Sequence, residues 1–275
     1  MRGERVRDEA DLGERGAVWW SRVAVVVGIV AVGALARLPT LRFPLDQDGS
    51  VFAYVAKVWS EGGVPYRDVW DHKPPLIYLA YRALFFVAPP GAYDVNLTLR
   101  LSSLACDLAT ALAVLALCWR LFDFRRGALA ALLCVCFTAA PFLQDEAFQP
   151  ERLTTLLTVA GLLAAVEYVR RRKLWISGLS GLLFGLALVT KQVAAPVGAL
   201  TWAWLTWEVL RSRGRGGWRR VLAHSLAMAL GVVVPWAVCF AYFAARGALA
   251  GFSCRMPASS SSSMSCMPCS TTWTH

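Results

Sequence analysis

Charged side chains and prolines crowd into residues 45–75, LDQDGSVFAYVAKVWSEGGVPYRDVWDHKPP, directly after an apolar run. Asp46 and Asp48 lie two residues apart at the start of this segment. Lys73 precedes two prolines, which restrict the backbone and hold the lysine in one place. A cation fixed at a membrane surface suits a lipid phosphate, and ionisable groups there are candidate functional residues. For any single carboxylate of this segment, the alternative is an ordinary solvated surface charge.

The composition is typical of a membrane protein. Of 275 residues, 57% are hydrophobic and only 17% are charged. Several apolar runs reach about the 20 residues that a helix needs to cross the hydrocarbon core. These runs are continuous rather than alternating, which excludes a transmembrane β-barrel. We therefore expect an all-α polytopic membrane protein with about seven transmembrane helices, at roughly residues 18–38, 97–119, 127–143, 152–169, 174–190, 193–210 and 221–244.

The basic residues indicate the orientation of these helices. The net charge of +10 comes from clusters between the apolar runs, where Lys and Arg determine topology, so we do not expect nucleic-acid binding. With a cytoplasmic N-terminal tail at 1–17, every cluster faces the cytoplasm. The transmembrane region then covers 18–252, and residues 39–96 form a long outer loop. The sequence predicts a multi-pass protein of the cell (plasma) membrane with its functional loops on the extracytoplasmic side.

Two short interfacial helices are expected in the outer loop. Apolar residues recur at helical spacing before Gly62-Gly63 and predict an amphipathic helix on the outer membrane surface; they are Val51, Phe52, Val55, Val58 and Trp59. The apolar segment 76–88 contains Arg82 and, at about 13 residues, is too short to cross the membrane. A crossing at this segment would place two basic loops outside, against the positive-inside rule.

Further charged residues fall on the predicted outer side. They are Arg100, Glu146, Glu151 and Lys191. For Lys191, at the outer end of the fifth span, a phosphate contact and simple snorkelling to the interface are equally favoured. No cysteine or histidine spacing defines a zinc site, because the CxxC of Cys266 and Cys269 has no second pair.

Residues 253–275 differ from the rest of the chain, because they are rich in Ser, Cys and Met and show no periodicity. A flexible tail is one interpretation. The abruptness of the change favours a shifted reading frame near residue 253, which would make the chain a truncated product.

The outer loop resembles that of the GT-C glycosyltransferases, and more narrowly the bacterial branch related to dolichyl-phosphate-mannose–protein mannosyltransferases and the lipid A aminoarabinose transferase. The shared features are an acidic pair after the first span, a G-x-P-Y turn and a K-P-P element, as in DQDGSVFAYVAKVWSEGGVPYRDVWDHKPPLIY. Further similar stretches are LTLRLSS, RRGALAALL and GLLFGLALVTK, so that the resemblance covers about residues 20–250.

The resemblance implies an inverting transferase that moves a sugar from a polyprenyl-phosphate donor to a lipid, protein or glycan acceptor outside the membrane. Asp48 matches the family's acidic residue that acts as general base, since Phe52 and Ala53 follow at the right spacing. Gly49 stands where a glutamate is usual, and Asp46 is the residue that would compensate for it.

The same resemblance assigns cations to the leaving phosphate, whose developing charge needs fixed positive groups. Lys73 is the first choice, Lys191 the second, and Arg100 a further contributor. Glu146 and Glu151 are candidates for acceptor contact or for a divalent cation, although no spacing defines a metal site.

Two other functions remain open. A multi-pass transporter or flippase component would carry charges near the membrane midplane and paired helix breaks, and a membrane scaffold would make no use of the K-P-P element. Family members usually continue for several more spans, so we expect this chain to be an inactive fragment if the frame is shifted.

Overall fold

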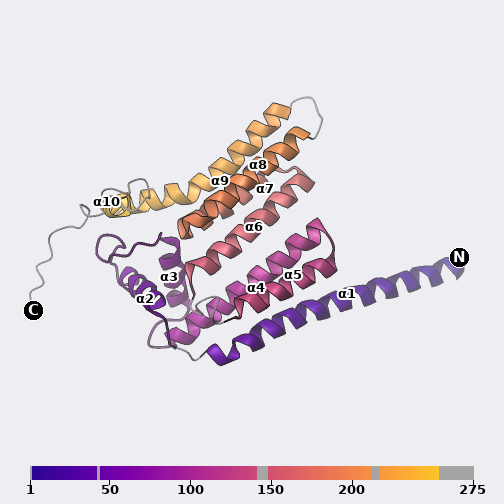
Figure 1. Ribbon diagram of the computed structural model, residues 1–275, viewed down its shortest axis with the longest axis horizontal. Coiled ribbons are helices and arrows are strands. Elements are labelled where there is room, and N and C mark those ends of the chain that lie inside the picture. Colours follow the sequence, from indigo (N-terminus) through magenta and orange to yellow (C-terminus); the bar gives the residue numbers. More distant parts are fainter. Residues whose placement is uncertain (1, 42–43, 141–147, 212–216, 254–275) are drawn as a thin grey trace, which may run out of the picture.

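The computed structural model describes residues 2–41, 44–140, 148–211 and 217–253. Within these ranges the chain is helical and forms no β-strand. Seven helices run along one common direction (Figure 1): α1 (Arg2–Arg37), α4 (Val95–Leu121), α5 (Phe124–Thr138), α6 (Pro150–Arg171), α7 (Leu174–Thr190), α8 (Ala195–Arg211) and α9 (Gly217–Ala245). Three shorter helices gather at one end of this bundle: α2 (Gln47–Ser60), α3 (Leu76–Val87) and α10 (Leu249–Ser253).

The protein is an all-α polytopic membrane protein, as the apolar runs predict. Five apolar helical segments are long enough to span the bilayer: Val18–Thr40, Val95–Leu121, Pro150–Arg171, Gln192–Arg211 and Gly217–Ala245. The other two predicted spans are the shorter helices α5 and α7, of 15 and 17 residues. The last residues of the predicted span 127–143 lie outside the described ranges. Helix α1 begins at Arg2, so it also includes most of the predicted tail.

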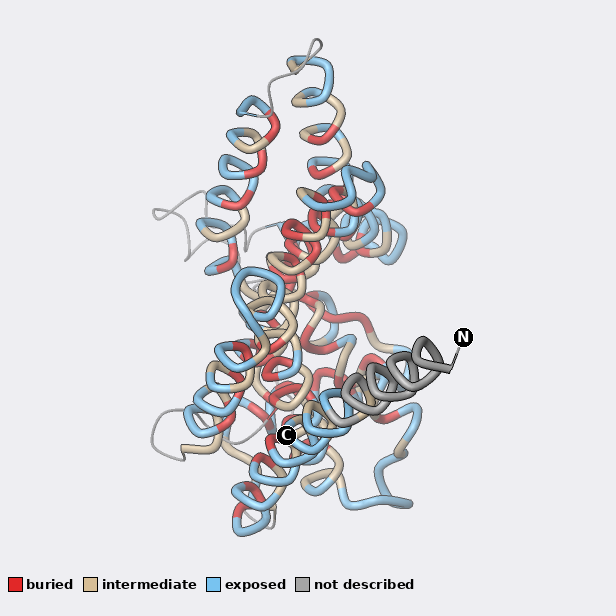
Figure 2. The backbone as a smooth tube through the Cα atoms, turned by 90° about the vertical axis from the view of Figure 1, so that its right-hand side faces the viewer, coloured by how far each residue is buried: buried red, intermediate tan, exposed pale blue. Residues whose placement is uncertain are grey.

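Large apolar side chains face outward along the long helices, as expected for surfaces in contact with lipid. Figure 2 shows exposed residues on the outer faces of the tube and buried residues where helices meet. The exposed side chains include tryptophans near the helix ends, for example Trp175, Trp207 and Trp218. Aromatic residues at this depth are typical of the membrane interface.

Helices α2 and α3 pack on each other rather than lying separately on the membrane. The ring of Phe52 contacts the rings of Tyr78 and Tyr81 at 6.0 and 5.9 Å between centroids. Trp59, at the other end of α2, contacts Phe243 of α9 at 6.5 Å. The predicted amphipathic helix is therefore present, but its apolar stripe is buried against protein and Val51 is left exposed.

Helices α7 and α9 approach so closely that their backbones touch. A Cβ atom on Gly181 would lie 2.0 Å from the Met228 carbonyl oxygen, and one on Gly231 would lie 2.2 Å from the Gly178 carbonyl oxygen. Small residues permit this kind of contact between membrane helices, where packing rather than hydrophobic burial drives association. The short helix α7 therefore packs against both α6 and α9, and its backbone touches that of α9 directly.

We expect Gly181→Leu to destabilise the protein by about 1–3 kcal/mol or more, because the side chain has no space against the α9 backbone. Thermal unfolding in detergent measures this loss. Gly28→Leu is the matched control, because a Cβ atom there meets no atom within 4 Å. Equal stability of the two variants would contradict the close α7–α9 contact.

Candidate functional site

Two of the predicted phosphate-binding residues line one cleft at the end of the bundle that carries α2, α3 and α10. Lys73 precedes α3, and Lys191 directly follows α7. The cleft has a volume of about 140 Å³. Its remaining lining residues combine polar groups and aromatic rings: Tyr66, His72, Pro74, Gln192, Trp236 and Phe252. The fold thus brings together two lysines that lie far apart in the sequence.

The backbone at Lys73 is held by a hydrogen bond. Its carbonyl oxygen accepts a hydrogen bond from the Tyr66 hydroxyl at 2.7 Å, and the Tyr78 hydroxyl, whose single proton goes to the nearer Asp71 carboxylate, lies 3.3 Å from it. The Tyr78 hydroxyl also lies 2.5 Å from an Asp71 carboxylate oxygen. Burial raises the pKa of the Tyr78 phenol, so this group stays protonated and donates. The sequence predicted a fixed lysine from its prolines, and the Tyr66 hydroxyl supplies additional support.

Glu151 is close to both lysines of the cleft. Its carboxylate forms an ion pair with the Lys191 ammonium group, and Lys73 also acts on it electrostatically. The Glu151 and Lys191 side chains are 46% and 31% exposed, so both remain accessible to a ligand. The cleft therefore combines two ammonium groups with the Glu151 carboxylate, and a second carboxylate, that of Asp71, lies 3.0 Å from the lining residue His72.

The two aspartates of the outer loop have different surroundings. Asp46 caps α2 by accepting from the Gly49 N–H at 3.1 Å, and it accepts from the Gln149 side-chain amide at 2.8 Å. Asp48 lies in the first turn of α2 and is exposed. Asp46 therefore joins α2 to the start of α6, whereas the Asp48 carboxylate faces solvent.

Arg100 lies outside the cleft. Arg100 is 5% exposed and donates to the Pro44 carbonyl oxygen at 2.7 Å and to the Asn96 side chain at 3.2 Å. These contacts tie α4 to the segment before Asp46 and do not place Arg100 beside Lys73 or Lys191. Glu146 lies outside the described residues.

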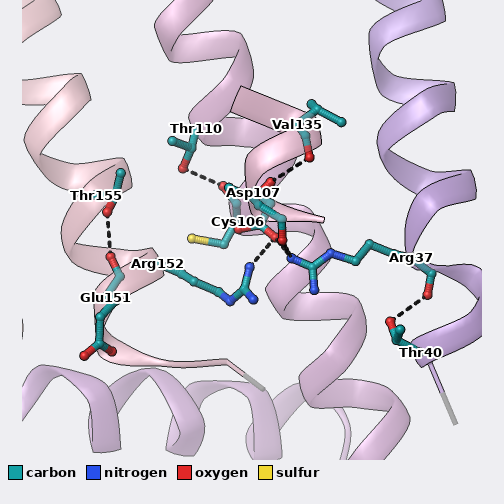
Figure 3. Close-up of polar contacts among 10 residues, drawn as sticks. Arg37, Thr40, Cys106, Asp107, Thr110, Val135, Glu151, Arg152 and Thr155 are labelled. Carbon is teal, nitrogen blue, oxygen red and sulfur yellow. Dashed lines mark hydrogen bonds and ion pairs between the residues drawn. The ribbon is translucent and has the colours of Figure 1, made fainter. Parts of the chain in front are cut away.

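The structure contains a buried cluster of three ion-paired residues that the sequence did not predict. Asp107 of α4 binds Arg37 at the end of α1, at 2.5 Å, and also Arg152 of α6. Arg37 donates in addition to the Thr138 carbonyl oxygen of α5. Figure 3 shows both guanidinium groups converging on Asp107 from opposite sides, with the side chain of Glu151 pointing away. The available signal was Asp107 itself, because an acid inside an apolar span requires a partner.

The start of α6 connects this buried group to the cleft. Gln149 binds Asp46, Glu151 binds Lys191, and Arg152 binds Asp107. Three residues within four positions therefore fix α2, the end of α7 and the centre of α4 relative to one another. A shift of α6 would move every one of these contacts together.

Asp107→Asn should destabilise the protein by about 3–5 kcal/mol, because it leaves two buried guanidinium groups without a carboxylate. The stability is measured by thermal unfolding in detergent. Glu61→Gln is the control, since that residue forms an exposed pair with Lys57 at 3.9 Å and such pairs contribute little. A loss below about 1 kcal/mol in Asp107→Asn would contradict the structural role of the buried group.

The sequence left open a divalent cation at Glu146 and Glu151, and the described residues form no cluster that would bind one. Among the described residues, no group of three or more His, Cys, Asp or Glu side chains is placed to hold a metal ion. Of the two candidate glutamates, Glu146 and Glu151, only Glu151 is described, and its carboxylate forms an ion pair with Lys191.

Comparison with protein families decides the class of this chain. The family model for dolichyl-phosphate-mannose-protein mannosyltransferases matches residues 72–238, which is more than half of the chain. The chain belongs to this family. It is therefore a membrane protein of the GT-C glycosyltransferase class, whose members use lipid-linked sugars. The matched range includes Lys73, Arg100, Glu151 and Lys191, while Asp46 and Asp48 precede it. A search of curated proteins found no match to the chain.

Proposed function

We propose that this protein transfers a sugar from a polyprenyl-phosphate donor to an acceptor on the extracytoplasmic side of the membrane, with inversion at the anomeric carbon. The observation that carries the proposal is the meeting of Lys73 and Lys191 in one cleft of a protein whose family uses lipid-linked sugars. The acceptor is a hydroxyl or similar group of a lipid, protein or glycan.

The cleft has the two chemical properties that such a donor needs. Its ammonium groups suit the phosphate, which carries negative charge before and after the reaction. Its aromatic rings, Trp236, Phe252 and Tyr66, suit the faces of a sugar or the first isoprene units. The cleft is lined by Lys191, which directly follows α7, and by Trp236 of α9.

In the proposed reaction, the acceptor oxygen attacks the anomeric carbon while the bond from that carbon to the phosphate oxygen breaks. The Asp48 carboxylate takes the proton of the acceptor hydroxyl. The bonding electrons leave with the polyprenyl phosphate, whose added charge is stabilised by Lys73 and Lys191. No cation or cofactor is needed to balance this step.

The contacts at the start of α6 place the first turn of α2, which carries Asp48, at the same end of the bundle as the cleft. Asp48 lies two residues from Asp46, which binds Gln149, and Gln149 lies two residues from Glu151, which binds Lys191. Asp46 holds the first turn of α2 in place, and Arg100 holds the preceding segment through the Pro44 carbonyl. We assign to these two residues the positioning of Asp48 and to Glu151, which is half exposed, contact with the acceptor.

The distribution of basic residues supports an extracytoplasmic position for the cleft. The described basic residues between the long helices lie at the end of the bundle opposite the cleft: Arg120, Arg125 and Arg126, then Arg170 to Lys173, and Arg211, Arg219 and Arg220. Under the positive-inside rule, that end faces the cytoplasm, so the cleft faces outward.

Asp48→Asn should reduce the rate of transfer about 10²–10⁴-fold while leaving folding unchanged, because the residue is exposed and its loss removes the general base. The measurement is release of polyprenyl phosphate from a labelled polyprenyl-phosphate hexose in membranes that supply acceptors. Glu61→Gln, just beyond the other end of α2, should retain full activity. Normal turnover by Asp48→Asn would overturn the assignment of the base.

Lys73→Gln and Lys191→Gln should each raise the KM for the lipid donor about tenfold or more, because each loses a charge-assisted contact to the phosphate. Their effects should be less than additive in the double variant if both lysines bind one phosphate. Lys57→Gln, an exposed lysine on α2, provides the control. A donor KM unchanged in both single variants would remove the cleft from the donor site.

A further inference from the structure

A second cavity lies at the opposite end of the bundle, where α6 ends and α9 begins. Its volume is about 380 Å³. Its lining residues come from the last turn of α6 and the start of α7, the last turn of α8 and the first turns of α9: Tyr168, Arg172, Leu174, Val209, Arg219, Arg220 and Ala223. Helix α6 has 22 residues and is about 33 Å long, so this cavity and the Lys73–Lys191 cleft lie near opposite membrane surfaces.

Three arginines line this cavity, and all three are exposed. Within the described parts of the chain, Arg172, Arg219 and Arg220 form no ion pair. The nearby carboxylate of Glu167 is already shared by Arg120 at 2.6 Å and Arg171 at 2.8 Å. Like charges gathered in this way repel one another, and an anion bound among them removes the repulsion.

The backbone also presents Arg172 in an uncommon conformation. Its φ angle is +54°, in the left-handed region that glycine or asparagine usually occupies after a helix. An arginine at such a position costs backbone energy, and positions of this kind are concentrated at binding sites. The side chain of Arg172 lines the cavity.

The opposite wall of the cavity is apolar. Tyr168 is 3% exposed and is backed by the ring of His224, 5.9 Å away between centroids, while Leu174, Val209 and Ala223 complete the wall. Trp218 and Trp175 are exposed beside it, and Arg219 lies over the Trp218 ring at 5.6 Å. These tryptophans place the cavity at the depth of the lipid headgroups.

We propose that this cavity binds an anionic phospholipid, with the headgroup phosphate among Arg172, Arg219 and Arg220 and the start of the acyl chains against the apolar wall. Basic cavities between transmembrane helices bind anionic headgroups in this way, and the cytoplasmic leaflet supplies such lipids. A free phosphate ion would use the arginines but not the wall. The site is separate from the proposed donor site and does not depend on the proposed transfer reaction.

The test compares two double variants of equal charge change. Native mass spectrometry of the full chain, purified from vesicles of phosphatidylglycerol and phosphatidylcholine, counts the lipids that it retains. The unmodified chain should retain phosphatidylglycerol in preference to phosphatidylcholine. Arg172→Gln with Arg220→Gln should reduce that retention about tenfold, because each charge near the membrane surface contributes to lipid affinity. Arg125→Gln with Arg126→Gln, in the α4–α5 connection at the same end of the bundle, should retain the lipid.

Three outcomes would overturn the proposal. Equal retention by the two double variants would show general attraction to an anionic surface rather than a site. Equal retention of the two lipids by the unmodified chain would exclude selection for charge. Displacement of the lipid by soluble glycerol phosphate at millimolar concentration would indicate a site for free phosphate. A further variant, Arg172→Lys with Arg220→Lys, keeps the charge and should retain the lipid, which separates lost binding from lost folding.

Discussion

The pairing of Asp107 with Arg37 and Arg152 is the constraint on which the arrangement of the helices depends. A charge buried among apolar helices is expensive, and these three buried side chains compensate one another by direct contact. Each comes from a different helix, so the same contacts that satisfy the charges also fix α1, α4 and α6 in one arrangement. Hydrophobic burial gives no comparable specificity between membrane helices, since lipid and protein interiors are equally apolar.

Helix α6 links these buried ion pairs to the cleft. Its first residues alternate between the buried group and the exposed site, because adjacent side chains on a helix point in different directions. Arg152 is directed to Asp107, while Glu151 is directed to Lys191 at the end of α7. The cleft is thus built on the fixed end of a helix, with the Tyr66 hydroxyl holding the Lys73 backbone on its other side. Preorganisation of this kind is what electrostatic stabilisation of a leaving phosphate requires.

The sequence predicted the features that depend on local patterns. Continuous apolar runs predicted the long helices, and the two prolines after Lys73 predicted a restricted backbone at that residue. Both effects act within a few residues of the chain. It did not predict the partners of Asp107, since nothing in the local spacing indicates which distant helix approaches it. The apolar stripe of α2 was recognised for the same local reason, yet its partner is α3 rather than lipid. Arg100 was grouped with the phosphate-binding cations because its contact with the Pro44 carbonyl exists only in the folded chain.

The backbone contact between α7 and α9 has a consequence for the position of the cleft. Helix α7 has 17 residues and is about 26 Å long, several ångströms less than an average hydrocarbon layer of about 30 Å. Because its glycines hold it against α9, it cannot slide along its neighbour to reach both headgroup regions. The ends of α7, Lys173 and Lys191, are therefore closer together along the bundle than the ends of the 22-residue helix α6 and the 29-residue helix α9. Lys191 and the cleft that it lines are consequently held nearer to the middle of the bundle than a helix of average span would place them.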